Sequence, residues 1–133
     1  MKKALMIGDL AAATGTKVNT IRFYEDIGLM PPAIRTQSGR RTYVAADVDR
    51  LAFIRHGRAL GFSIDQIRSL LELSFHPERD CADASAIARE HLRDIEERIA
   101  RLNRLSIELT KIADSCDGGR AADCAVIEAI AGG

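Results

Sequence analysis

A heptad repeat runs along the C-terminal half of this chain. From residue 88 onward, apolar or small side chains recur at alternating intervals of four and three residues for nearly four repeats. They are Ala88, Leu92, Ile95, Ile99, Leu102, Ser106, Leu109 and Ala113. This spacing predicts a single long helix that begins at about residues 81–84, ends at Ser115 and carries an apolar seam along one face.

The seam needs a partner helix. Charged residues such as Arg93, Glu97 and Arg101 occupy the other faces, and at about 1.5 Å per residue the repeat spans roughly 40 Å. Packing against another helix of the same chain is the alternative, but the short tail offers little surface. A second copy of the chain is the simplest partner, so we predict a homodimer formed through a coiled coil.

Charge divides the chain into two halves. The 133 residues have no net charge, yet residues 1–68 hold 11 basic and 6 acidic side chains, a net +5, and the remainder holds 8 and 13, a net −5. A basic half joined to an acidic half is typical of a nucleic-acid-binding module fused to a second part. Chance partitioning of the charges is the alternative.

The composition is that of an ordinary globular protein, with 47% apolar and 29% charged residues. No apolar run approaches the roughly 18 residues that a membrane span requires. The first residues have a basic tip but lack the apolar stretch and cleavage site of a signal peptide. We therefore expect a cytoplasmic protein without a membrane partner.

The first 28 residues predict a helix-turn-helix. MIGDLAAAT and KVNTIRFYEDIG each suit a short helix, and Thr14-Gly15 separates them. In the second helix, Val18, Ile21 and Phe23 are expected to face inward. The outward, DNA-facing set is expected to be Lys17, Asn19, Thr20, Arg22 and Tyr24, whose side chains suit base edges or phosphates.

A small β-wing is predicted next. Pro31-Pro32 ends the helical pattern, and AIRTQSGRRTYV reads as two extended pieces around Ser38-Gly39. Arg40, Arg41, Thr42 and Tyr43 lie close together and suit contacts with DNA phosphates. Taken singly, each of these residues could instead be an ordinary solvated surface residue without a DNA contact.

Two more helices complete the N-terminal part. Asp47 is the expected N-cap of the first, with Val48, Leu51 and Ile54 inward. Ser63 is the expected N-cap of the second, and Gln66 completes a capping box.

Three cysteines stand at the ends of the long predicted helix. Cys81 precedes it, and Cys116 and Cys124 bracket a Gly-containing turn after it. An odd number of cysteines argues against a disulfide framework, whereas thiolates are natural ligands of soft metals. About 50 Å of helix separates Cys81 from Cys116 in one chain, but an antiparallel dimer brings Cys81 beside the partner's other two cysteines.

Other roles and ligands remain open for this cysteine set. Three small buried thiols are the alternative to a metal site. Asp117, Asp123, His76 or His91 are candidates for an additional ligand. A third thiolate favours a divalent soft ion (cadmium, lead, zinc or mercury).

The sequence gives no support for an enzyme. It has no Ser/His/Asp order, no Gly-rich phosphate loop and no catalytic carboxylate pair. A drug sensor needs a sizeable C-terminal pocket domain, and an iron–sulfur sensor needs four clustered cysteines. Thiol-based redox sensing remains an alternative signal.

These residues carry a family resemblance that covers nearly the whole chain. IGDLAAATGTKVNTIRFYEDIGLM, RTQSGRRTYV and LGFSIDQIRSLLEL resemble the DNA-binding domain of the MerR family of transcription regulators. Arg40 departs from the pattern, since the family usually has an aromatic residue there. CADASAIAREHL and CDGGRAADCAVIEAI resemble the cadmium/lead-responsive branch.

The resemblance implies a function for the whole molecule. It implies a homodimer that binds a pseudo-palindromic promoter with an over-long spacer. Metal binding then twists the DNA and realigns it for RNA polymerase, typically to activate an efflux gene. It carries metal ligation onto Cys81, Cys116 and Cys124, and DNA contact onto Arg22, Tyr24, Arg41 and Tyr43.

The predicted fold is mainly α. We expect a winged helix-turn-helix domain over residues 1–75, a linker and antiparallel coiled-coil dimerisation helix over 76–115, and a metal-binding loop with a C-terminal tail over 116–133. The predicted function is a metal-responsive transcription activator. A copper(I)-responsive or redox-sensing regulator is the alternative.

Overall fold

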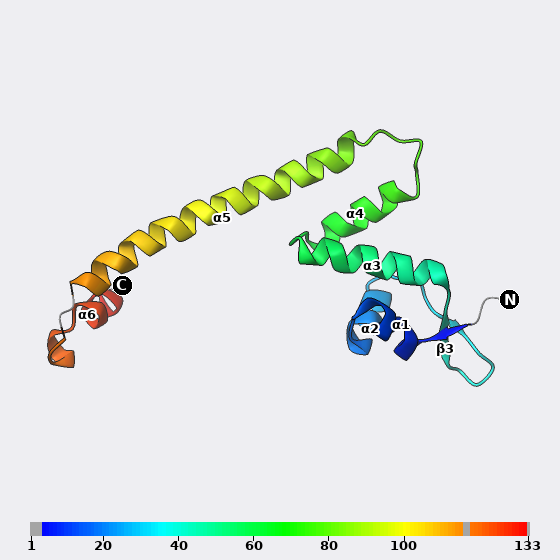
Figure 1. Ribbon diagram of the computed structural model, residues 1–133, viewed down its shortest axis with the longest axis horizontal. Helices are drawn as coiled ribbons and strands as arrows, with labels where there is room; N and C mark the ends of the chain where they lie inside the picture. Colours follow the sequence, from blue (N-terminus) through cyan, green and yellow to red (C-terminus); the bar gives the residue numbers. More distant parts are fainter. Residues whose placement is uncertain (1–3, 116–117, 133) are drawn as a thin grey trace. The chain divides into compact units, whose positions relative to one another are not determined.

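The computed structural model describes residues 4–115 and 118–132 (Figure 1). The chain divides into two compact units, Met1–Ser85 and Ala86–Gly133. The first contains four helices: α1 (Ile7–Thr14), α2 (Val18–Asp26), α3 (Ala45–Ala59) and α4 (Ile64–Ser74). The prediction of a mainly helical fold with a small wing is confirmed.

The first unit has one hydrophobic core. Helix α1 packs against α2 and α3, and α3 packs against α4. The buried side chains are Leu10, Ile21, Tyr24, Leu29, Met30, Tyr43, Leu51, Ile54, Ile67 and Leu71. They come from all four helices of this unit, from the segment after α2 and from the wing, so the helix-turn-helix and the wing share one folded body.

A turn at Gly15 separates α1 from α2. Gly15 has φ of 66°, a left-handed conformation that glycine adopts without a steric penalty. Its N–H donates to the Ala11 carbonyl and closes the end of α1. The predicted helix-turn-helix therefore forms where the sequence places it.

The wing belongs to a three-stranded antiparallel sheet. Strand β3 (Arg41–Tyr43) lies between β1 (Leu5–Met6) and β2 (Ile34–Arg35). The sequence predicted only the two pieces on either side of Ser38-Gly39. Strand β1 was missed because two residues next to a helix are too short to show an alternating pattern.

Of the two predicted N-cap residues, one is confirmed and the other is wrong. At α4, Ser63 Oγ accepts from the Gln66 N–H at 3.1 Å and Gln66 Oε1 accepts from the Ser63 N–H at 2.9 Å, which confirms the capping box. At α3, the prediction that Asp47 is the N-cap is wrong. The helix begins at Ala45, and Asp47 lies in its first turn, where its carboxylate accepts from the Val44 N–H at 2.9 Å.

The long predicted helix is confirmed as α5 (Ala82–Asp114), which has 33 residues and crosses the division between the units. No residue of α5 is buried within this chain. A 3₁₀ turn, η1 (Ala121–Asp123), and a short helix, α6 (Ala125–Ala131), follow it. Within the described residues, no helix has the length and apolar character required to cross a membrane.

Candidate functional site

Helix α2 presents polar residues near its start. Lys17, Asn19 and Arg22 are exposed and Thr20 is half-buried, so their side chains are accessible as predicted. This helix follows the turn of the helix-turn-helix, the position at which a recognition helix enters the major groove in proteins of this architecture.

Two aromatic residues of α2 are oriented opposite to the prediction. Tyr24 was expected to face outward but is only 8% exposed, whereas Phe23 was expected inward and is 48% exposed. The reason is helical periodicity: Tyr24 lies three residues after buried Ile21 and shares its face, while Phe23 does not. Tyr24 is therefore mainly a core residue.

Tyr43 is also a core residue. It is 2% exposed, and its hydroxyl donates to Glu25 Oε1 at 2.8 Å. Burial, followed by the hydrogen bond to Glu25, raises the pKa of Tyr43 above its usual range, so the hydroxyl stays protonated as a donor. The expectation that Tyr43 lies on the surface of the wing is wrong.

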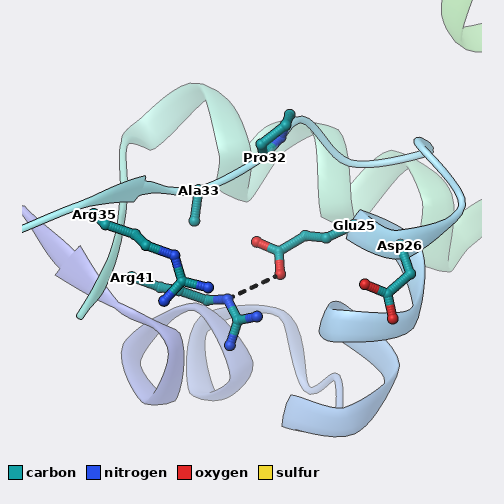
Figure 2. Close-up of a pocket in the computed structure, with 6 residues that line it drawn as sticks. All are labelled: Glu25, Asp26, Pro32, Ala33, Arg35 and Arg41. Atoms are coloured by element: carbon teal, nitrogen blue, oxygen red, sulfur yellow. Dashed lines mark ion pairs between the residues drawn. The ribbon is translucent and has the colours of Figure 1, made fainter. Parts of the chain in front are cut away.

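Glu25 links the recognition helix to the wing. Its side chain is 7% exposed, and Oε2 lies 3.4 Å from Nε of Arg41 on β3. Figure 2 shows both side chains in a pocket at this junction that Asp26, Pro32, Ala33 and Arg35 also line. No sequence pattern singles out Glu25, and only its place in the segment predicted as the second helix could have drawn attention to it.

The wing contributes arginines from both of its strands. Arg35 pairs with Arg41 across β2 and β3, which places the two side chains on the same face. Arg40 is exposed and Arg41 is 27% exposed. Arg35 was missed, although its position on the other side of Ser38-Gly39 was a usable signal.

Several arginines of the basic half have structural partners. Arg50 donates to the Leu29 carbonyl at 2.8 Å, Arg58 to that of Phe62 at 2.6 Å and Arg68 to that of Ile27 at 2.9 Å. Arg55 donates to the carbonyls of Thr14 and Gly15 at the end of α1. Part of the positive charge predicted to attract DNA therefore also satisfies carbonyl groups at helix ends and in the segments that follow helices.

The cysteines divide between the two units. Cys81 is exposed immediately before α5 and lines a cleft of about 280 Å³, whose other lining residues include Phe53, Leu73 and His76. Cys124 is half-buried at the start of α6. Cys116, together with the candidate ligand Asp117, lies outside the described residues.

The other candidate ligands are not gathered around one point. His76 Nδ1 lies 3.3 Å from a carboxylate oxygen of Glu78, His91 is half-buried on α5, and Asp123 is exposed in η1. Across residues 4–115 and 118–132, no three His, Cys, Asp or Glu side chains converge to hold a metal ion.

Two family models match this chain. A family model described as "MerR HTH family regulatory protein" matches residues 5–74, and another described as "MerR, DNA binding" matches residues 48–112. The chain is thus a helix-turn-helix regulatory protein. It belongs to the MerR family.

Individual relatives agree with this assignment. Heavy metal-dependent transcription regulator 2 of Rhizobium meliloti (strain 1021) is 42% identical over 96% of this chain and 86% of its own length. The crystal structure of the transcription regulator PbrR691 from Ralstonia metallidurans CH34 in complex with lead(II) has a TM-score of 0.86 and 32% identity, covering 95% of this chain and 98% of that one.

A further solved structure shows the same architecture. The dual function transcriptional regulator MerR from Bacillus megaterium MB1, in complex with mercury(II), has a TM-score of 0.69 and 28% identity over 95% of this chain and 98% of its own. These relatives are transcription regulators, which confirms the prediction that the chain is not an enzyme.

Proposed function

We propose that this protein is a metal-responsive transcription activator that binds promoter DNA as a homodimer. Metal binding is proposed to switch the bound promoter into the form that RNA polymerase uses. The effector is a divalent soft metal ion held by Cys81, Cys116 and Cys124, with the first from one chain and the other two from its partner.

The observation that carries the proposal is the exposed seam of α5 with cysteines beyond both of its ends. Leu92, Ile99, Leu102 and Leu109 are 51%, 52%, 64% and 60% exposed within one chain. A row of large apolar side chains along a 33-residue helix is typical of a helix whose apolar face packs against another helix. In an antiparallel pair, the start of one helix lies beside the end of the other.

The cysteine chemistry fits a soft metal. Cys81 is exposed, so its thiol is accessible to an ion and to a second chain. Three thiolates suit lead or mercury, and one more ligand completes the tetrahedral geometry of zinc or cadmium. Two relatives are described in complex with lead(II) and mercury(II), which supports a metal of this class.

The DNA-binding surface is proposed to combine α2 and the wing. Lys17, Asn19, Thr20 and Arg22 are proposed to contact the major groove and its phosphates. Arg40 and Arg41 are proposed to bind phosphates beside it, together with Arg35. Tyr24 and Tyr43 support these contacts from the core rather than forming the surface.

The test is a titration of the reduced, metal-free protein with cadmium, lead, zinc, mercury and copper(I), followed by thiolate-to-metal charge-transfer absorbance. We expect a divalent ion to saturate at one per chain, and serine at any of the three cysteine positions to abolish tight binding. Copper(I) binding that survives Cys81→Ser would instead support a copper sensor. Activation by an oxidant without metal would support redox sensing.

A further inference from the structure

The junction between the recognition helix and the wing depends on one buried carboxylate. Glu25 lies in the last turn of α2, and its two polar partners, Arg41 and Tyr43, both lie on β3. Figure 2 shows the Glu25 carboxylate directed toward the Arg41 guanidinium, with Arg35 beside it and Asp26 further along the helix.

This arrangement leaves Glu25 incompletely satisfied. Oε1 accepts the Tyr43 hydroxyl at 2.8 Å, but Oε2 is buried and has no hydrogen-bond partner among the described residues. Its compensation is the charge of Arg41, whose Nε lies 3.4 Å away. Because a buried ion pair often contributes little or nothing to stability compared with apolar residues of similar volume, stability alone does not account for a carboxylate here.

The contact has a geometric consequence for Arg41. A guanidinium carries five N–H donors, and the contact with Glu25 uses the Nε side. The four Nη hydrogens remain for an anion, and the side chain is still 27% exposed. The carboxylate therefore restricts the orientation of the guanidinium without covering the edge that best suits a phosphate.

We propose that Glu25 is a positioning residue for DNA recognition: it holds Arg41, and with it the wing, in a fixed register with helix α2. The inference rests on the proposed DNA-binding function. Glu25 itself is an anion and does not attract phosphate. Its role is to make the phosphate contact of the wing coincide with base contacts from α2, which contributes to specificity rather than to general affinity.

The experiment uses the full-length protein and two duplexes of equal length. One is selected by the protein from a random-sequence pool, and the other is its scrambled version. Affinities are measured by fluorescence anisotropy for the wild type, Glu25→Gln, Arg41→Gln and the double variant. Glu25→Gln retains the shape of the side chain and an acceptor for Tyr43, and it removes only the charge that holds Arg41.

We expect Glu25→Gln to weaken binding to the selected duplex about tenfold and to have no such effect in the Arg41→Gln background. Binding to the scrambled duplex should stay equal or become tighter, because the protein loses one negative charge. Equal weakening on both duplexes, or effects of the two substitutions that add fully, would overturn the proposal.

Asp26→Asn is the matched control. Asp26 is the neighbouring acidic residue in the same pocket, and it is exposed. Its substitution removes the same charge without touching the Arg41 contact, so the preference for the selected duplex should not change. A loss of preference equal to that of Glu25→Gln would overturn the proposal by showing that net charge alone matters.

Two further measurements separate this inference from folding and from the proposed function. Thermal unfolding is recorded for every variant, and Glu25→Asp provides a second test because it retains the charge but withdraws the carboxylate by one methylene. It should also lose preference for the selected duplex. If the wild type enriches no duplex at all, the DNA-binding proposal fails. If the wild type discriminates and neither Glu25 variant changes its preference, only the positioning role fails.

Discussion

The first unit and helix α5 are built on opposite principles. The first unit buries ten side chains from four helices, the wing and the segment that follows α2 in one core. Helix α5 buries none of its 33 residues within the chain, although apolar residues recur along it. The first unit can therefore be understood from one chain, whereas α5 carries an apolar pattern for which we propose a second chain as the partner.

A substitution at Leu51 tests whether the first unit has its own core, and we expect it to have the largest effect. Leu51 is fully buried on α3, so Leu51→Ala removes apolar contacts and leaves a cavity. We expect the free energy of unfolding to fall by about 2–5 kcal/mol, measured by urea denaturation. Phe53→Ala, on the same helix but 37% exposed, is the control and should cost clearly less. Equal losses would contradict the assignment of the core.

The next effect tests the seam. Leu102→Glu places a charge where the partner helix is expected, once for each chain of the dimer. We expect dimerisation to weaken by about a hundredfold or more, measured by sedimentation equilibrium. Ile107 is similarly exposed at 59% but lies off the heptad positions, so Ile107→Glu should leave the dimer intact. A reversed result would show that another face of α5 is covered.

A smaller effect tests the turn of the helix-turn-helix. Gly15 has a left-handed backbone, and a Cβ there would lie 2.5 Å from Nη1 of Arg55, which binds the end of α1. Gly15→Ala should destabilise the protein by about 1–2 kcal/mol in thermal unfolding. Gly8→Ala is the control, since nothing lies within 4 Å of its Cβ position. A cost at Gly8 equal to that at Gly15 would remove the conformational argument.

The smallest effect concerns a helix start. Ser63→Ala removes the side-chain acceptor for the Gln66 N–H and should cost about 1 kcal/mol in the same assay. Asp47→Asn at α3 retains an acceptor for the Val44 N–H and should cost less. Loss of more stability at Asp47 than at Ser63 would make α3 the helix that depends more on its cap.

The sequence could predict the features that depend on residues close together in the chain. The heptad seam, the helix-turn-helix and the Ser63 capping box depend on local spacing and on side chains close in sequence, and all three were found. Strand β1 was missed because its pairing with β3 joins residues nearly forty positions apart, and two residues carry no pattern of their own.

The site was predicted less completely than the fold, for a related reason. Lys17, Asn19 and Arg22 were correctly expected to be exposed, since polar residues usually lie on a helix surface. Buried Tyr43 donates a hydrogen bond to Glu25, 18 positions away, and the carbonyl contact of Arg55 reaches across 41 positions. Partners this distant in sequence are decided by tertiary packing, which local patterns do not reveal.

A mixed dimer can show whether two chains share each metal site. One chain carries Cys81→Ser and the other Cys116→Ser with Cys124→Ser. Each variant alone lacks a complete set of three thiolates in either arrangement. The purified heterodimer, however, regains one intact set if ligands are shared between chains. We predict that it binds cadmium or lead tightly at one ion per heterodimer. If the wild type binds metal and the heterodimer binds none, the ligands come from a single chain. That result would rule out a metal site shared between chains.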